Sequence, residues 1–127
     1  MINHDEIYFK KKKGLSIYWF HKASALKDSA DILWSSMNGR NWGDVKFPVY
    51  MMLCGMSLEL IYKAIVVANN NEPNTRSHSL KELSKEAGLQ VNNEQSGMLQ
   101  ILSEAIIWDG RYPVVNASVN PQLFAAG

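Results

Sequence analysis

The sequence predicts an all-α fold, an antiparallel up-and-down bundle of four to five helices. Apolar residues recur at steps of three and four over long stretches, which places them on one side of a helix. Asn, Gly and Pro punctuate these stretches, and the apolar–polar alternation typical of β-strands is nearly absent. The 127 residues suit a single domain over 1–127, with a lead-in at 1–14 and an irregular tail at 114–127.

The first helix is expected between about Leu15 and Met37. Asn38 and Gly39 tolerate the left-handed backbone conformation that ends many helices, so they are predicted to end this one. Its expected apolar stripe consists of Trp19, Ala23, Leu26, Ala30, Leu33 and Met37.

The second helix is expected between Pro48 and Ala68. It is almost wholly apolar and about as long as a membrane span. Glu59 and Lys63 lie four residues apart in the order that favours a helical ion pair. Each charge would cost about 2.5–3.5 kcal/mol at the centre of a bilayer. We therefore expect the central helix of a soluble bundle, and no membrane. Gly55, one turn before Glu59, allows another backbone or a ligand to approach closely.

A short helix follows the polar stretch NNNEPN. Ser79 and Glu82 have the S-x-x-E spacing of a capping box, in which each side chain binds a backbone amide of the other residue. Gly88 is expected to end this helix near Ala87.

The last helix is expected from Asn92 or Asn93 to about Trp108, with Gly110 and Pro113 beyond its end. Its apolar residues again recur at helical spacing. The stripe predicted to be buried consists of Met98, Leu99, Leu102, Ala105 and Ile106.

Composition excludes several classes of function. The net charge of +1 is too small for a protein that coats nucleic acid, so any such contact must be local. Cys54 is the single cysteine, which excludes an internal disulfide and suits a reducing cytoplasm. Residues 1–14 do not resemble a secretory signal. Without a glycine-rich phosphate loop, a metal-ligand cluster or a nucleophile–base motif, we expect neither a metal nor a cofactor.

Two candidate sites lie along the middle of the chain. Arg76 and His78 could bind an anion at the free amides of the short helix. In the alternative, Ser79 and Glu82 occupy those amides, and His78 packs over the end of the second helix. Glu59 and Lys63 could bind a ligand, or form a polar seam that fixes the register of the bundle or a dimer interface.

The segment that follows the last helix is the third candidate site. Arg111 offers a planar fork for phosphate, while Tyr112 and Trp108 offer stacking faces for a base. In the alternative interpretation, Arg111 bridges to Glu59 or Asp109 and the rings close the end of the bundle.

The order of three motifs resembles the HEPN family (higher eukaryotes and prokaryotes nucleotide-binding). They are S-L-E-L-I-Y-K-A at 57–64, S-H-S-L-K-E-L at 77–83 and W-D-G-R-Y-P at 108–113. The likeness covers roughly residues 16–113. It implies a four- or five-helix bundle that often dimerises. Many members are ribonucleases of toxin–antitoxin and phage-defence systems, whereas others accompany nucleotidyltransferases or bind nucleotides.

The chain departs from the ribonuclease branch of this family. There, the catalytic Arg and His are separated by four to six residues and lie across a dimer cleft, whereas Arg76 and His78 have one residue between them. They are therefore only weak catalytic candidates. We expect a non-catalytic, cytoplasmic, homodimeric module that binds a nucleotide, RNA or a protein, such as a nucleotidyltransferase or an antitoxin. Its expected ligand-binding residues are Glu59, Lys63, His78, Arg111 and Tyr112.

Two alternatives remain at this stage. One is a metal-independent endoribonuclease, in which His78 with Arg76 or Arg111 activates the ribose 2′-hydroxyl and stabilises the developing charge. The other is a purely structural domain that docks a partner protein through exposed apolar residues.

Overall fold

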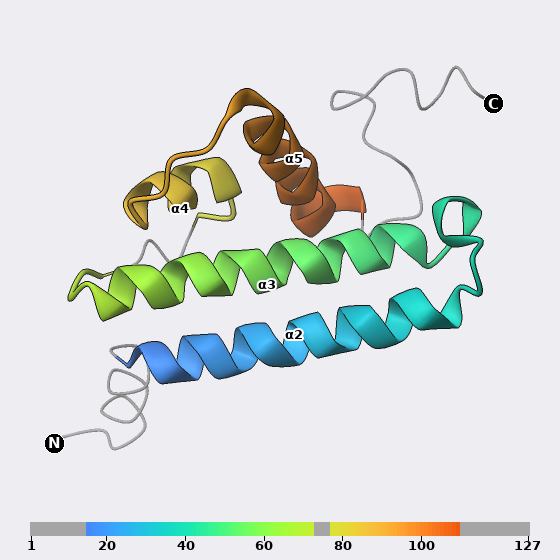
Figure 1. Cartoon of the computed structure of the whole chain (residues 1–127), viewed down its shortest axis with the longest axis horizontal. Helices are drawn as coiled ribbons and strands as arrows, with labels where there is room; N and C mark the ends of the chain where they lie inside the picture. Colours follow the sequence, from blue (N-terminus) through green and yellow to red (C-terminus); the bar gives the residue numbers. More distant parts are fainter. Residues whose placement is uncertain (1–14, 73–76, 110–127) are drawn as a thin grey trace, which may run out of the picture.

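The computed structural model describes residues 15–72 and 77–109, in which the regular secondary structure is helical and no β-strand occurs (Figure 1). The predicted all-helical fold is confirmed. The α-helices are α2 (Ser16–Ser36), α3 (Phe47–Ala68), α4 (Leu80–Glu86) and α5 (Asn93–Glu104). A 3-10 turn, η1 (Asn41–Gly43), lies between α2 and α3, and a π-helical turn, η2 (Ala105–Asp109), continues α5.

Helix α3 is the central layer of the molecule. Figure 1 shows α2 running antiparallel along one side of α3, while α4 and α5 lie on its other side, with α5 inclined to it. Extensive contacts join α2 to α3, and α3 also contacts α4, α5 and η2. Among the described elements, α2 makes no comparable contact beyond α3. The expected central position of the 48–68 segment is therefore confirmed.

The main core lies between α3 and the α4–α5–η2 layer. Its buried residues are Tyr62, Val66, Leu80, Leu83, Ala87, Leu99, Leu102 and Ile106. A narrower seam joins α2 to α3, where Ala23 and Ala30 are fully buried. Across this seam, Ser57 donates a hydrogen bond from Oγ to the carbonyl oxygen of Ala23 at 2.9 Å. The small side chains let the two helices approach closely.

Gly55 is required by close packing. A Cβ atom at this position would lie 2.9 Å from Cγ1 of Ile106 and 2.9 Å from the carbonyl oxygen of Leu102. The predicted close approach of another backbone is confirmed, and the approaching segment is the junction of α5 and η2.

The predicted ends of α2 and α4 are confirmed by the backbone. Asn38 and Gly39 follow α2 with φ of 52° and 80°, and Gly88 follows α4 with φ of 79°. These values lie in the left-handed region that Gly and Asn adopt most easily. At the start of α4, Ser79 Oγ accepts a hydrogen bond from the amide of Glu82 at 3.3 Å.

The predicted capping box at Ser79 is only half formed. Instead of returning to the amide of Ser79, the Glu82 carboxylate accepts a hydrogen bond from Ser77 Oγ at 3.4 Å. A complete box begins α5. There, Asn92 Oδ1 accepts from the amide of Gln95 at 2.8 Å, and Gln95 Oε1 accepts from the amide of Asn92 at 3.0 Å.

The last helix differs from the prediction at two points. Its α-helical hydrogen bonding ends at Glu104, and the π-helical turn continues to Asp109. Met98, expected in the buried stripe, is 51% exposed, whereas the other four residues of that stripe are buried. Leu99 and Leu102 face the core, and Met98, about 100° away around the helix, lies beyond its edge.

Helix α3 is long and apolar enough to cross a membrane by length and composition. Central helices of globular folds meet the same criteria, and α3 is packed between two layers of helices. Its two buried charges, Glu59 and Lys63, are paired with each other. The absence of a membrane partner stays a prediction.

Candidate functional site

A buried ion pair forms the base of the candidate site. Glu59 and Lys63 lie one turn apart on α3, and Nζ of Lys63 is 3.1 Å from Oε2 of Glu59. The two side chains are only 10% and 3% exposed, respectively. Because a buried charge is costly without a partner, the pairing predicted from the sequence is what makes these residues tolerable here.

His78 is the second partner of Glu59. Its Nδ1 lies 2.6 Å from Oε1 of Glu59, so each oxygen of the carboxylate contacts a different residue. An ionised carboxylate can only accept hydrogen bonds, which assigns the proton of this contact to Nδ1. The imidazole is 44% exposed. Because Nδ1 is engaged by Glu59, Nε2 on the other edge of the ring is the ring nitrogen that remains for a ligand.

The segment that carries His78 is fixed on both sides by serines. Ser77 Oγ accepts a hydrogen bond from the amide of Ser79 at 3.2 Å. The amide of Leu80 donates to Ser103 Oγ at 3.0 Å, and Ser103 Oγ in turn donates to the carbonyl oxygen of Leu99 at 2.8 Å. The backbone next to His78 is thus attached to α5 as well as to α4.

These contacts also occupy amides that an anion would need. Ser79 Oγ binds the amide of Glu82, and Ser103 Oγ binds the amide of Leu80. The start of α4 is therefore mainly satisfied by the protein itself, which favours the structural interpretation of this helix start. The role of Ser103 as the acceptor for the Leu80 amide was not predicted from the sequence. A serine in a helix does not indicate which distant amide it will contact.

The predicted site residues fall into two groups. Glu59, Lys63 and His78 are brought together, although they are separated by up to 19 positions. The Lys63 side chain is only 3% exposed, and in this structure its ammonium balances the charge of Glu59. Arg76, Arg111 and Tyr112 lie outside the described residues, as does the predicted bridge from Arg111 to Glu59.

The group in this cluster that can act chemically is the imidazole of His78, which Glu59 holds in one orientation. Glu59 holds one ring nitrogen, and the other can donate or accept a proton according to the charge of the ring. Within 15–72 and 77–109, no three His, Cys, Asp or Glu side chains gather where they could hold a metal ion.

Comparison of the chain with protein-family models, curated proteins and solved structures returns no match. The resemblance to the HEPN family rests on the three sequence motifs at 57–64, 77–83 and 108–113. Residues from two of these motifs form the Glu59–Lys63–His78 cluster.

Proposed function

We propose that this chain is a non-catalytic, HEPN-like helical module that binds the phosphate of a nucleotide or of RNA at His78. The proposal includes a cytoplasmic homodimer and the antiparallel up-and-down arrangement of four to five helices. Its main support is the 2.6 Å contact between His78 Nδ1 and Glu59 Oε1, which orients a half-exposed imidazole. An oriented donor loses less entropy on binding than a freely rotating one.

The charges of the cluster favour an anionic ligand. Glu59 contributes one negative charge and Lys63 one positive charge, so the pair is neutral by itself. When the imidazole of His78 is protonated, the cluster carries one net positive charge, and Nε2–H can donate to a phosphate oxygen. Without Lys63, the carboxylate would cancel the imidazolium. Lys63 therefore matters to binding even though it is buried.

Arg111 and Tyr112 complete the proposed binding surface. Arg111 supplies a second cation with a planar pair of donors, and Tyr112 supplies a face on which a base can stack. This part of the proposal rests on the sequence, because both residues lie outside the described ranges. Arg76, two residues before His78, is a third source of positive charge.

A binding screen tests the proposal. The purified protein is titrated with ATP, GTP, AMP, inorganic phosphate and labelled single-stranded RNA, and binding is followed by calorimetry and thermal shift. We expect at least one phosphate-containing ligand to bind, and His78→Gln to weaken it about tenfold, a loss of about 1.4 kcal/mol. His21→Gln, on the exposed surface of α2, is the matched control. If none of these ligands binds, or if His78→Gln binds like the wild type, the proposal is wrong.

A metal-independent endoribonuclease is the second candidate function. The contact between His78 Nδ1 and Glu59 Oε1 favours it as well. A carboxylate that holds one nitrogen of an imidazole is the arrangement of a general base, here directed at a ribose 2′-hydroxyl. Arg76 or Arg111 would stabilise the developing negative charge. The test is cleavage of labelled RNA in the presence of a chelator. Cleavage that is lost in His78→Ala would replace the non-catalytic proposal with this one.

A further inference from the structure

The loop that joins α2 to α3, residues 37–46, holds two apolar side chains out in water. Val45 is 89% exposed and Trp42 is 83% exposed, the highest fractions among the large hydrophobic residues that the structure describes. Figure 1 places this α2–α3 loop at the end of the two long helices that is farthest from α4. These side chains therefore project from one tip of the described fold.

The loop is held in this shape by residues that point inward. Met37 and Asn41 are buried, with exposed fractions of 2% and 7%. Nδ2 of Asn41 donates a hydrogen bond to the carbonyl oxygen of Trp34 at 3.1 Å, which attaches the 3-10 turn η1 to the last turn of α2. Turning Trp42 and Val45 toward the core would require breaking these contacts. Their exposure is therefore built into the loop.

A row of aromatic rings supports Trp42 from behind. Its ring centroid lies 4.8 Å from that of Phe47, at the start of α3. Phe47 is followed by Tyr50 at 6.0 Å, and Tyr50 by Trp34 at 4.8 Å. These contacts leave most of the Trp42 ring uncovered, since its exposed fraction is 83%. The ring is thus oriented by its neighbours and directed outward.

The apolar area at this tip is too small for a stable protein interface. A tryptophan side chain buries about 150–250 Å² when it is fully covered. Stable interfaces bury about 800 Å² on each partner, so Trp42 and Val45 together fall well short of this value. A lipid bilayer sets no such minimum, because binding to it grows with the inserted apolar area and with the attraction of basic residues to anionic lipids.

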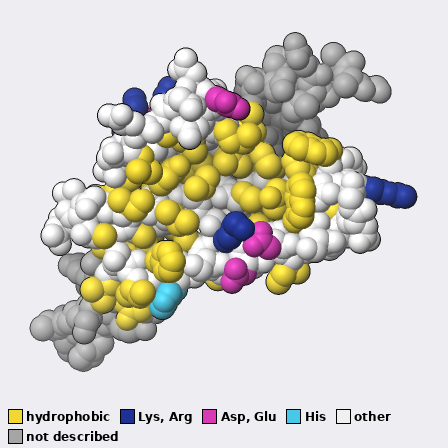
Figure 2. Space-filling view, viewed as in Figure 1, with side chains coloured by type: hydrophobic (Ala, Val, Ile, Leu, Met, Phe, Trp, Pro, Cys, Tyr) yellow, Lys and Arg dark blue, Asp and Glu magenta, His cyan; other side chains and the backbone are white. Residues whose placement is uncertain are grey.

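The charges of the loop match an anionic lipid surface. Arg40 is exposed and Lys46 is half-buried. Asp44 is the single acidic residue of 37–46, and its Oδ1 accepts a hydrogen bond from the amide of Lys46 at 2.8 Å. Two basic residues and one acidic residue leave one net positive charge. Figure 2 shows a basic side chain extending from this end of the molecule. Such charges are attracted to the negative surface of a cytoplasmic leaflet.

We propose that the α2–α3 loop binds the surface of an anionic lipid bilayer. Trp42 and Val45 insert at the boundary between headgroups and acyl chains, and Arg40 contacts the headgroups. Tryptophan suits this boundary because its ring is apolar while its N–H can still donate a hydrogen bond. A fluid surface accepts protruding side chains without a matching groove. The contact is weak and reversible, because even a single acyl anchor gives only marginal binding.

This contact differs from a membrane span. The expectation of no membrane partner came from the cost of placing Glu59 and Lys63 inside a bilayer. Glu59 lies twelve residues after Phe47, about 18 Å further along α3. Insertion of the loop therefore leaves both charges within the protein and avoids that cost, so a surface contact replaces the expectation. It also leaves His78 in water. Lipid binding by the loop and phosphate binding at His78 can each fail while the other holds.

Flotation with lipid vesicles tests the proposal. Vesicles of phosphatidylcholine alone are compared with vesicles of phosphatidylcholine and phosphatidylserine. The wild type is expected to float with the mixed vesicles, and less with phosphatidylcholine alone. Trp42→Ala and Val45→Ser are each expected to weaken partitioning at least about tenfold. Arg40→Gln is expected to weaken it about fivefold, and on the mixed vesicles only.

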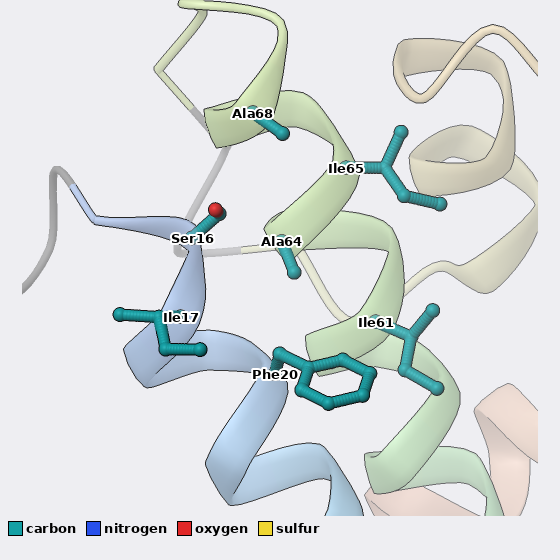
Figure 3. Close-up of a pocket in the computed structure, with 7 residues that line it drawn as sticks. All are labelled: Ser16, Ile17, Phe20, Ile61, Ala64, Ile65 and Ala68. Carbon is teal, nitrogen blue, oxygen red and sulfur yellow. The ribbon is translucent and has the colours of Figure 1, made fainter.

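Phe20→Ala is the matched control. Phe20 is 52% exposed and lines a hollow of about 370 Å³ beside Ile61, near the opposite end of α2 (Figure 3). It lies sixteen residues, or about 24 Å, before the last residue of α2, so it should remain in water and leave flotation unchanged. His78→Gln is a second control, which excludes binding of the lipid phosphate at His78. Far-ultraviolet circular dichroism checks that each variant is folded.

Three results would overturn the inference. The first is a wild-type protein that floats with neither kind of vesicle; if light scattering then shows an assembly that Trp42→Ala disrupts, the loop contacts protein instead. The second is flotation that Trp42→Ala and Val45→Ser leave as strong as Phe20→Ala does. The third is flotation that is lost in His78→Gln and retained in Trp42→Ala, which would assign lipid binding to the phosphate site.

Discussion

The Nδ1 atom of His78 lies 2.6 Å from Oε1 of Glu59, which joins a half-exposed ring before α4 to a buried carboxylate in the middle of α3. Lys63 binds the other oxygen of the same carboxylate at 3.1 Å. The buried carboxylate of Glu59 therefore contacts both Lys63 and His78, one through each oxygen. This shared carboxylate links the stability of the fold to the orientation of the candidate ligand-binding residue.

Removing one member of the buried ion pair should be more harmful than removing both. Glu59→Met leaves the Lys63 ammonium buried without its carboxylate, which should lower the free energy of unfolding by about 3–5 kcal/mol. In Glu59→Met/Lys63→Met no charge is stranded, so we expect part of this loss to be recovered. Urea unfolding of the wild type, both single variants and the double variant measures the coupling. Strictly additive losses would contradict the pairing.

Gly55→Ala should destabilise the protein by overpacking. The new Cβ atom would meet Ile106 and the backbone of Leu102 at 2.9 Å, and a forced shift of this kind costs about 1–3 kcal/mol. Gly97→Ala in α5 is the control, because nothing lies within 4 Å of its Cβ position. There we expect a gain of about 0.5–1 kcal/mol from helix propensity. Thermal unfolding of the two variants should move in opposite directions.

Ser103→Ala should loosen the start of α4. It removes the acceptor of the Leu80 amide, and Leu80 is fully buried. A buried donor left without a partner costs about 1–3 kcal/mol. Amide hydrogen exchange should report faster exchange of the Leu80 amide as well as lower global stability. Ser29→Ala, which removes an exposed hydroxyl bonded to the carbonyl oxygen of Ala25, should change stability by less than about 0.5 kcal/mol.

Tyr50 should make the protein sensitive to strongly alkaline solution. Burial, and then a hydrogen bond with Cys54 and the charge of its thiolate, raise the pKa of Tyr50 from its usual 10.0 to about 12. The folded protein thus holds this proton more tightly than the unfolded chain does. The resulting stabilisation is complete below pH 10.0 and is lost as the pH rises toward about 12. Tyr50→Phe should unfold with a shallower pH dependence over that interval, and equal slopes would contradict the assignment.

Features of the fold that depend on neighbouring residues were predictable from the sequence. Helix α2 ends where Asn38 and Gly39 adopt positive φ, and α4 ends before Gly88, because these residue types accept that backbone conformation at little cost. The Glu59–Lys63 pair was predictable for the same reason, since residues four apart on a helix are always neighbours.

The parts that required coordinates depend on where distant segments meet. Met98 has the helical spacing of a core residue, yet it is exposed because the position of α5 on α3 decides which side is covered. The complete capping box at Asn92 and the half-formed one at Ser79 differ through side-chain geometry that similar sequence patterns leave open.

The amino-acid order by itself determined the helices, the ends of α2 and α4 and the charged pair within α3, because each of these is settled by contacts within one or two turns. The packing of the chain alone decided that α2 covers one side of α3 while α4 and α5 cover the other. It also decided that His78 contacts Glu59, 19 positions away, and that Leu80 contacts Ser103, 23 positions away. Such contacts follow from how whole helices bury their surfaces against one another, and local spacing carries no information about that choice.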